Sequence, residues 1–136
     1  MKADRAVILV GHGGVPTDCP ASLVSDFKRE EATAGDRQTA AFVAADRKLR
    51  AWPRTAETDP YQMGLTAIAA RLRQALPDHV VYEAYNEFCA PSLEEALDLS
   101  VRNGAKTVTI ISTMYTRGGI HSETDIPELL KRERAK

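Results

Sequence analysis

The stretch of sequence that decides the fold is AVILVGHGG, at residues 6–14. Its first five residues are apolar and mostly β-branched, a pattern typical of a strand buried on both faces of a sheet. Two further runs of strand character follow at residues 80–85, VVYEAY, and 107–112, TVTIIS. The sequence therefore predicts three short β-strands.

Segments of helical character separate these strands. Residues 36–51 carry an apolar face and an opposite charged face with helical periodicity, and Pro60 fits the first turn of another helix. Residues 92–95, SLEE, form a capping-box sequence that predicts the start of a helix, and Gly104 suits the end of that helix. Residues 125–128, DIPE, predict one more helix start. A helix is thus expected after every strand.

The predicted order of elements is β-α-α-α-β-α-β-α, in which helices connect consecutive strands and make them parallel. We therefore expect an α/β fold with a small, parallel, doubly wound sheet flanked by helices. A chain of 136 residues has room for one hydrophobic core, so we expect a single domain over residues 1–136. Ligands of such sheets bind beyond the carboxyl ends of the strands, and candidate site residues are therefore expected there.

Charge and composition exclude several classes of protein. The net charge is −1, so no overall electrostatic field would attract nucleic acid or an anionic membrane surface. No apolar run approaches the roughly 18 residues of a membrane span, and the N-terminus lacks the apolar core of a signal peptide. Cys19 and Cys89 have no CxxC spacing, so neither a disulfide framework nor a zinc knuckle is indicated. We expect a cytoplasmic protein.

Two histidines and a carboxylate follow the predicted strands. His12 comes directly after the first strand, Glu87 after the second and His121 after the third, whereas His79 precedes the second strand. The first three should therefore share one edge of the sheet, and His79 should lie exposed at the opposite edge. Histidine is the commonest metal ligand and a base near neutral pH. Because glycines flank both His12 and His121, a large planar ligand could approach the backbone and the imidazoles there.

Other interpretations compete with this one. Residues 11–14 could instead form a phosphate-binding loop, although the spacing matches no phosphate-loop motif and Asp18 is the only candidate nucleophile nearby. Glu87 could be a solvated loop carboxylate or a proton acceptor. Cys89 is expected to be a buried, small apolar side chain rather than a ligand. Arg117 could be a solvated cation or a partner for substrate carboxylates.

Three segments together resemble a known family. They are the GHGG after the first strand at residues 11–14, YNEFCAPSLEEA at 85–96 and TRGGIHSETDIP at 116–127. In this order they resemble the small class II chelatases of the sirohydrochlorin cobaltochelatase (CbiX-like) family. The resemblance covers about a third of the chain, and the helices between the segments also fit.

The resemblance implies insertion of a divalent metal into sirohydrochlorin or a related tetrapyrrole, in cobalamin or sirohaem synthesis, without a nucleotide. His12 and His121 would bind the metal, and Glu87 would help to remove the pyrrole protons. Imidazole ligands suit Co²⁺, the expected metal, and also Fe²⁺ and Ni²⁺. The residues expected to lie against the tetrapyrrole are Gly13, Gly14, Arg117, Gly118 and Gly119.

The sequence departs from the family pattern in two places. A helical insert between Asp18 and Asp59 is longer than in the smallest members and could cover the site. The fourth strand of the family pattern does not follow the third strand, and an unpaired sheet edge invites pairing with another chain. We therefore expect a homodimer. A non-catalytic metal-binding or tetrapyrrole-binding protein is the second functional candidate, and an enzyme acting on phosphate esters is the third.

Overall fold

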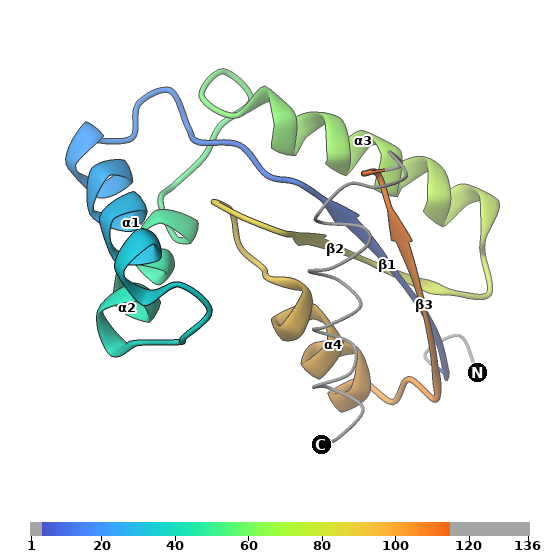
Figure 1. Cartoon of the computed structure of the whole chain (residues 1–136). Coiled ribbons are helices and arrows are strands. Elements are labelled where there is room, and N and C mark those ends of the chain that lie inside the picture. The colour runs from blue at the N-terminus through green and yellow to red at the C-terminus, as the bar shows by residue number, and fades with distance from the viewer. Residues whose placement is uncertain (1–3, 115–136) are drawn as a thin grey trace.

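The computed structural model describes residues 4–114, and Figure 1 shows how the elements are arranged. The helix expected to start near residue 125 lies outside the described residues. Three strands and four helices follow one another in the order β1 (Arg5–Gly11), α1 (Ala21–Ala34), α2 (Ala40–Arg50), α3 (Pro60–Ala75), β2 (Val80–Tyr85), α4 (Leu93–Arg102) and β3 (Thr107–Ser112). The expected α/β order is confirmed over this part of the chain.

The three strands form one parallel sheet in the order β2-β1-β3. In this register Gly11 of β1 lies opposite Tyr85 of β2, and Val10 lies opposite Ser112 of β3. Every residue of β1 after Arg5 is buried, as the continuous apolar run predicts for a central strand. All three strands consequently end at the same edge of the sheet.

Helices cover both faces of the sheet, because alternate side chains of β1 point to opposite sides. Val7 and Leu9 pack in one cluster with Leu65 and Ala69 of α3. Ile8 and Val10 pack in the other cluster with residues of α4, namely Leu93 and Ala96. This arrangement is the expected doubly wound sheet, and it leaves the carboxyl edge of the strands to the loops.

The helix boundaries follow from their capping residues. Ser92 and Glu95 form the expected capping box at the start of α4, and Gly104 follows its end with a φ of 101°. The helix expected over residues 36–51 begins only at Ala40, because the Thr39 side chain accepts a hydrogen bond from the amide of Phe42 and caps it.

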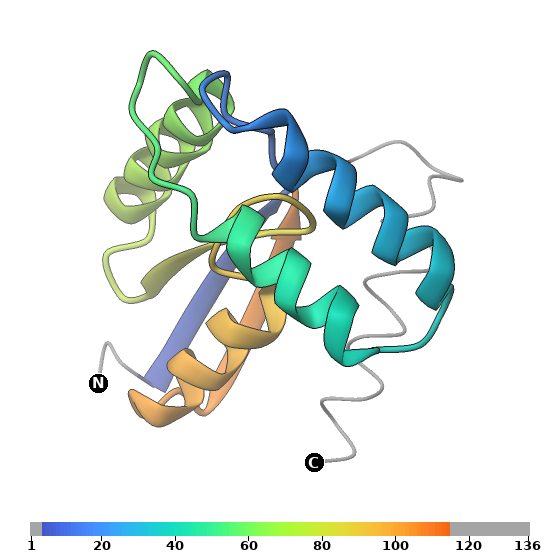
Figure 2. The same cartoon turned by 90° about the vertical axis from the view of Figure 1, so that its left-hand side faces the viewer.

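The insert forms the helical pair α1 and α2, which lies beside the end of the sheet where β1 and β2 finish (Figures 1 and 2). The two helices contact each other through Phe27 and Phe42, whose ring centroids are 5.6 Å apart. Phe27 also contacts Phe88, in the loop after β2, at 5.7 Å. The insert therefore packs against the loop after β2 at the carboxyl edge of the sheet. Within residues 4–114, no helix is long and apolar enough to cross a membrane.

Candidate functional site

His12 and Glu87 lie side by side at the carboxyl edge of the sheet. The hydrogen-bonded ladder between β1 and β2 continues past the strands, because Asn86 donates its amide to Gly11 and Glu87 donates its amide to His12, both at 2.8 Å. The imidazole Nε2 of His12 is 3.4 Å from the carboxylate Oε2 of Glu87. The two side chains are 38% and 26% exposed, so both a metal ion and a proton-bearing substrate could reach them.

The imidazole of His12 is oriented by its own loop. Its Nδ1 lies 2.9 Å from the carbonyl oxygen of Gly13, and its backbone amide donates to the hydroxyl of Tyr61 at 2.7 Å. When Nδ1–H donates to this carbonyl, the Nε2 atom beside Glu87 carries the lone pair that a metal ion needs. The phenyl ring of Phe88 borders the imidazole at a centroid distance of 5.9 Å.

Gly13 is required by the packing of the two loops. Its φ is +100°, and a Cβ atom at this position would lie 1.9 Å from the carbonyl oxygen of Glu87. A Cβ atom on Gly11 would likewise lie 2.9 Å from the hydroxyl of Tyr61. These glycines allow close approach of protein to protein, whereas the sequence interpretation assigned the same freedom to a ligand. Contact of Gly13 and Gly14 with a tetrapyrrole stays a prediction.

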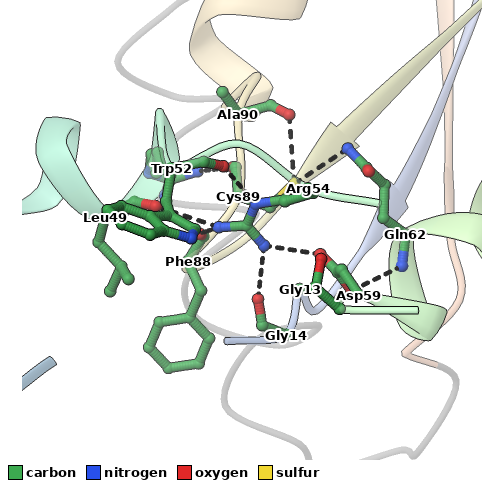
Figure 3. Close-up of polar contacts among 12 residues, drawn as sticks. Gly13, Gly14, Leu49, Trp52, Arg54, Asp59, Gln62, Phe88, Cys89 and Ala90 are labelled. Atoms are coloured by element: carbon green, nitrogen blue, oxygen red, sulfur yellow. Dashed lines mark hydrogen bonds and ion pairs between the residues drawn. The ribbon is translucent and has the colours of Figure 1, made fainter. Parts of the chain in front are cut away.

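Two arginines that the sequence analysis did not select hold the loop after β2. Arg50 donates hydrogen bonds to the carbonyl oxygens of Tyr85, Asn86 and Cys89. Arg54 forms an ion pair of 2.7 Å with Asp59, and the side chains are only 4% and 2% exposed (Figure 3). A buried charge needs a partner, and this pair meets that requirement. Sequence patterns give little warning of it, because Arg54 lies in a connector without periodicity.

Burial and neighbouring charges raise the pKa values of two other groups near the site, Cys89 and Glu31. Cys89 is 1% exposed, and this burial raises the pKa of its thiol, which therefore stays neutral near neutral pH. Cys89 is thus a buried, small side chain, as predicted. Partial burial and the negative charges of Glu87 and Asp46 raise the pKa of Glu31 in α1. The insert thus brings further negative charge toward the site, which favours the approach of a divalent cation.

The other candidate residues are distributed as follows. His121, Arg117, Gly118 and Gly119 lie outside the described residues. His79 lies at the opposite end of the sheet, as predicted, but the expectation that it is exposed is wrong. It is half-buried, and its Nδ1 has no hydrogen-bond partner within the described part of the chain. Among residues 4–114, no group of three or more His, Cys, Asp or Glu side chains is placed to hold a metal ion.

The structure gives little support to a phosphate-binding loop at residues 11–14. The space beside Gly11 and Gly13 is filled by Tyr61 and by the backbone of Glu87. Asp18, the only candidate nucleophile, accepts a hydrogen bond of 3.0 Å from the indole of Trp52. The loop therefore packs against protein groups, and Asp18 is engaged with Trp52.

A parallel α/β sheet with an imidazole and a carboxylate on adjacent loops at its carboxyl edge is consistent with a chelatase-like domain. Comparison with protein families matches the CbiX family over residues 54–136, which is more than half of the chain, and the protein belongs to this family. The family indicates a class II chelatase, which inserts a metal into a tetrapyrrole. The matched segment contains Glu87 and His121, whereas His12 precedes it. No curated protein matches the chain.

Proposed function

We propose that this protein inserts Co²⁺ into sirohydrochlorin or a closely related tetrapyrrole, with His12 and His121 as metal ligands and Glu87 as a proton acceptor. The observation that carries the proposal is the 3.4 Å separation between the His12 imidazole and the Glu87 carboxylate in a member of a chelatase family. Fe²⁺ and Ni²⁺ are the alternative metals, because imidazole suits all three. The metallated tetrapyrrole would then be an intermediate of cobalamin or sirohaem synthesis.

The reaction requires a metal ion and a proton acceptor in close proximity. A divalent ion replaces two pyrrole N–H protons of the macrocycle, so two protons leave for each metal inserted. A neutral imidazole can hold the ion weakly enough to release it, since few protein ligands leave coordination positions open for the pyrrole nitrogens. The Glu87 carboxylate, beside Nε2 of His12, would take one of these protons, and solvent would take the other.

The substrate would be oriented by groups that complement its carboxylates. The N-terminal turn of α4, which begins after Ser92, lies close to the loop of Glu87, but Glu94 and Glu95 in that turn already balance the helix dipole, so it would not attract a further carboxylate. Arg117 would add a cation, and Gly118 and Gly119 would let the macrocycle approach the backbone. The aromatic ring of Phe88 would border it on the side of the insert.

Metal-dependent turnover tests the proposal. Purified protein is mixed with sirohydrochlorin and with Co²⁺, Fe²⁺ or Ni²⁺ in parallel, and the absorbance change of the macrocycle is followed against the spontaneous reaction. Acceleration with at least one metal, strongest with Co²⁺, is expected. Tight binding of the metal or the macrocycle without acceleration would favour the non-catalytic binding protein instead.

We further propose that the protein acts as a homodimer in the cytoplasm. In the sheet that the described residues form, β2 and β3 are the two outer strands. Val108, Ile110 and Ile111 of β3 are only partly buried there, so pairing with a second chain would cover apolar surface. Both cysteines are free thiols, which suits a reducing compartment.

A further inference from the structure

Arg54 connects the two loops that carry the proposed site residues. Its Nη1 atom donates to the carbonyl oxygen of Gly14 at 2.7 Å, and its Nη2 atom donates to the carbonyl oxygen of Phe88. Gly14 lies two residues after His12, and Phe88 directly follows Glu87. The remaining donor hydrogens of the guanidinium bind Asp59, Leu49 and Trp52, so all five are used (Figure 3).

From this geometry we propose that Arg54 is a positioning residue, which fixes the separation between His12 and Glu87 by bridging the loops that carry them. The inference rests on the proposed function only for its catalytic consequence. The bridge itself is a property of the fold and can be measured without any substrate.

The bridge is needed because the backbone ladder ends at the site. Its last hydrogen bond joins the amide of Glu87 to the carbonyl of His12. Immediately beyond it, Phe88 has a φ of 67°, a left-handed conformation that costs a residue with a side chain about 1–2 kcal/mol. Surrounding contacts must therefore hold this residue in place. Arg54 holds its carbonyl oxygen, and the rings of His12 and Phe27 flank its side chain.

The bridge is anchored to the core of the protein. Asp59 accepts from Arg54 through Oδ2, and its Oδ1 accepts from the amide of Gln62 at 3.0 Å, which caps α3. Because α3 packs on β1, the guanidinium is held by an element of the core that belongs to neither loop. A planar guanidinium can reach Gly14, Phe88 and Asp59 at once, whereas a lysine ammonium offers three donors at a single atom.

Arg50 provides a matched control. Its side chain is also largely buried, at 12% exposed, and it also holds the loop after β2, but its carbonyl partners in that loop are Tyr85, Asn86 and Cys89. No bond to the loop of His12 is seen for Arg50 in the described part of the chain. The variants Arg50→Lys and Arg54→Lys therefore both weaken the loop of Glu87, and only the second also breaks the connection to the loop of His12.

Hydrogen exchange decides between bridging and general support. In Arg54→Lys, we expect the amide of Glu87 to exchange at least about tenfold faster relative to the amide of Leu9, which reports opening of the core. In Arg50→Lys this ratio should change by less than about threefold. Equal increases in the two variants, or an increase matched by Leu9, would overturn the proposal. If Arg54→Lys does not fold, the same ratio is measured in Asp59→Glu, which keeps a negative charge beside the guanidinium and displaces its anchor by one methylene group.

Metallation kinetics supply the second readout. Arg54→Lys should lower kcat at least about tenfold with KM changed by less than about threefold, because the reacting groups are displaced and most of the substrate surface is untouched. Glu87→Gln should then cost less in the Arg54→Lys background than in the wild type. A change confined to KM, or fully additive effects, would contradict the positioning role. If the wild type metallates no tetrapyrrole, the proposed function fails, while the exchange comparison still decides the bridge.

Discussion

The backbone amide of Glu87 donates a hydrogen bond to the carbonyl oxygen of His12, one step beyond the last paired residues of β1 and β2. The sheet register therefore extends into the loops and brings the two side chains within 3.4 Å. Residues 75 positions apart in the chain thus share one site because two parallel strands end together.

If His12 is a metal ligand as proposed, His12→Ala should reduce metal insertion at least about a hundredfold with little effect on folding, because the half-exposed imidazole contributes little core packing. His121→Ala should have a similar effect on the rate. His79→Ala is the control, since this residue lies at the other end of the sheet. The metal-insertion rates of the three variants are compared per amount of folded protein, which is checked by circular dichroism. A loss for His79→Ala as large as for His12→Ala would refute the assignment of the site to the carboxyl edge.

Glu87→Gln should slow metallation by roughly 10²–10⁴-fold, because the amide keeps the shape of the side chain and cannot accept a proton from a pyrrole nitrogen. Metal affinity, measured by calorimetry with Co²⁺ alone, should stay within about threefold of wild type. A parallel loss of affinity and rate would instead make Glu87 a ligand or an orienting partner of His12.

Gly13→Ala should destabilise the protein more than Gly104→Ala. The two glycines have nearly the same φ, +100° and +101°, but a Cβ atom would clash with the backbone of Glu87 only at Gly13. The left-handed conformation should cost each variant about 1–2 kcal/mol, and the clash should add roughly 1–3 kcal/mol at Gly13. Denaturant unfolding measures both free energies. Equal destabilisation would mean that the loops separate easily and that their close contact is not a constraint.

Alkaline pH should destabilise the protein partly through Cys89. Burial raises the pKa of this thiol above its ordinary value of 9.0, so the folded state keeps its proton where the unfolded chain loses it. The thiol therefore stabilises the fold fully below that value, and this contribution is lost as pH rises toward the folded pKa. Between pH 7 and 10, Cys89→Ala should lose less free energy of unfolding than wild type. Tyr85, whose pKa burial also raises, is present in both proteins. Identical losses of unfolding free energy in the two proteins would show that the Cys89 thiol does not contribute to the alkaline destabilisation.

The strands and two helix starts could be predicted from sequence because they depend on local patterns. The run at residues 6–10 is apolar throughout only because β1 is central, and Ser92 with Glu95 caps α4 through contacts within one turn. The edge position of His12 and Glu87 followed from the rule that parallel strands end together.

The features that could not be predicted depend on contacts between distant segments. The sequence offered no sign that Arg54 reaches Gly14, 40 positions away, and Phe88, 34 positions away. Gly13 was expected to let a ligand approach the backbone, which stays a prediction, and its close contact with the Glu87 backbone could not be foreseen. His79 was expected to be exposed because it precedes a strand, yet it is half-buried.

Self-association is the last prediction, and it concerns the edges of the sheet. Among residues 4–114, β3 pairs with β1 alone, and its apolar side chains are only partly buried. An edge strand of this kind presents both backbone hydrogen-bonding groups and apolar surface to a partner, and a symmetric dimer is the commonest way to cover them. The insert helices add no comparable surface, because Phe27 and Leu49, in α1 and α2, are buried within the chain. Light scattering at micromolar protein should give twice the mass of one chain, and dilution should shift it toward a monomer. A monomer at every concentration would mean that each chain covers its own edge, and the dimer would then be rejected.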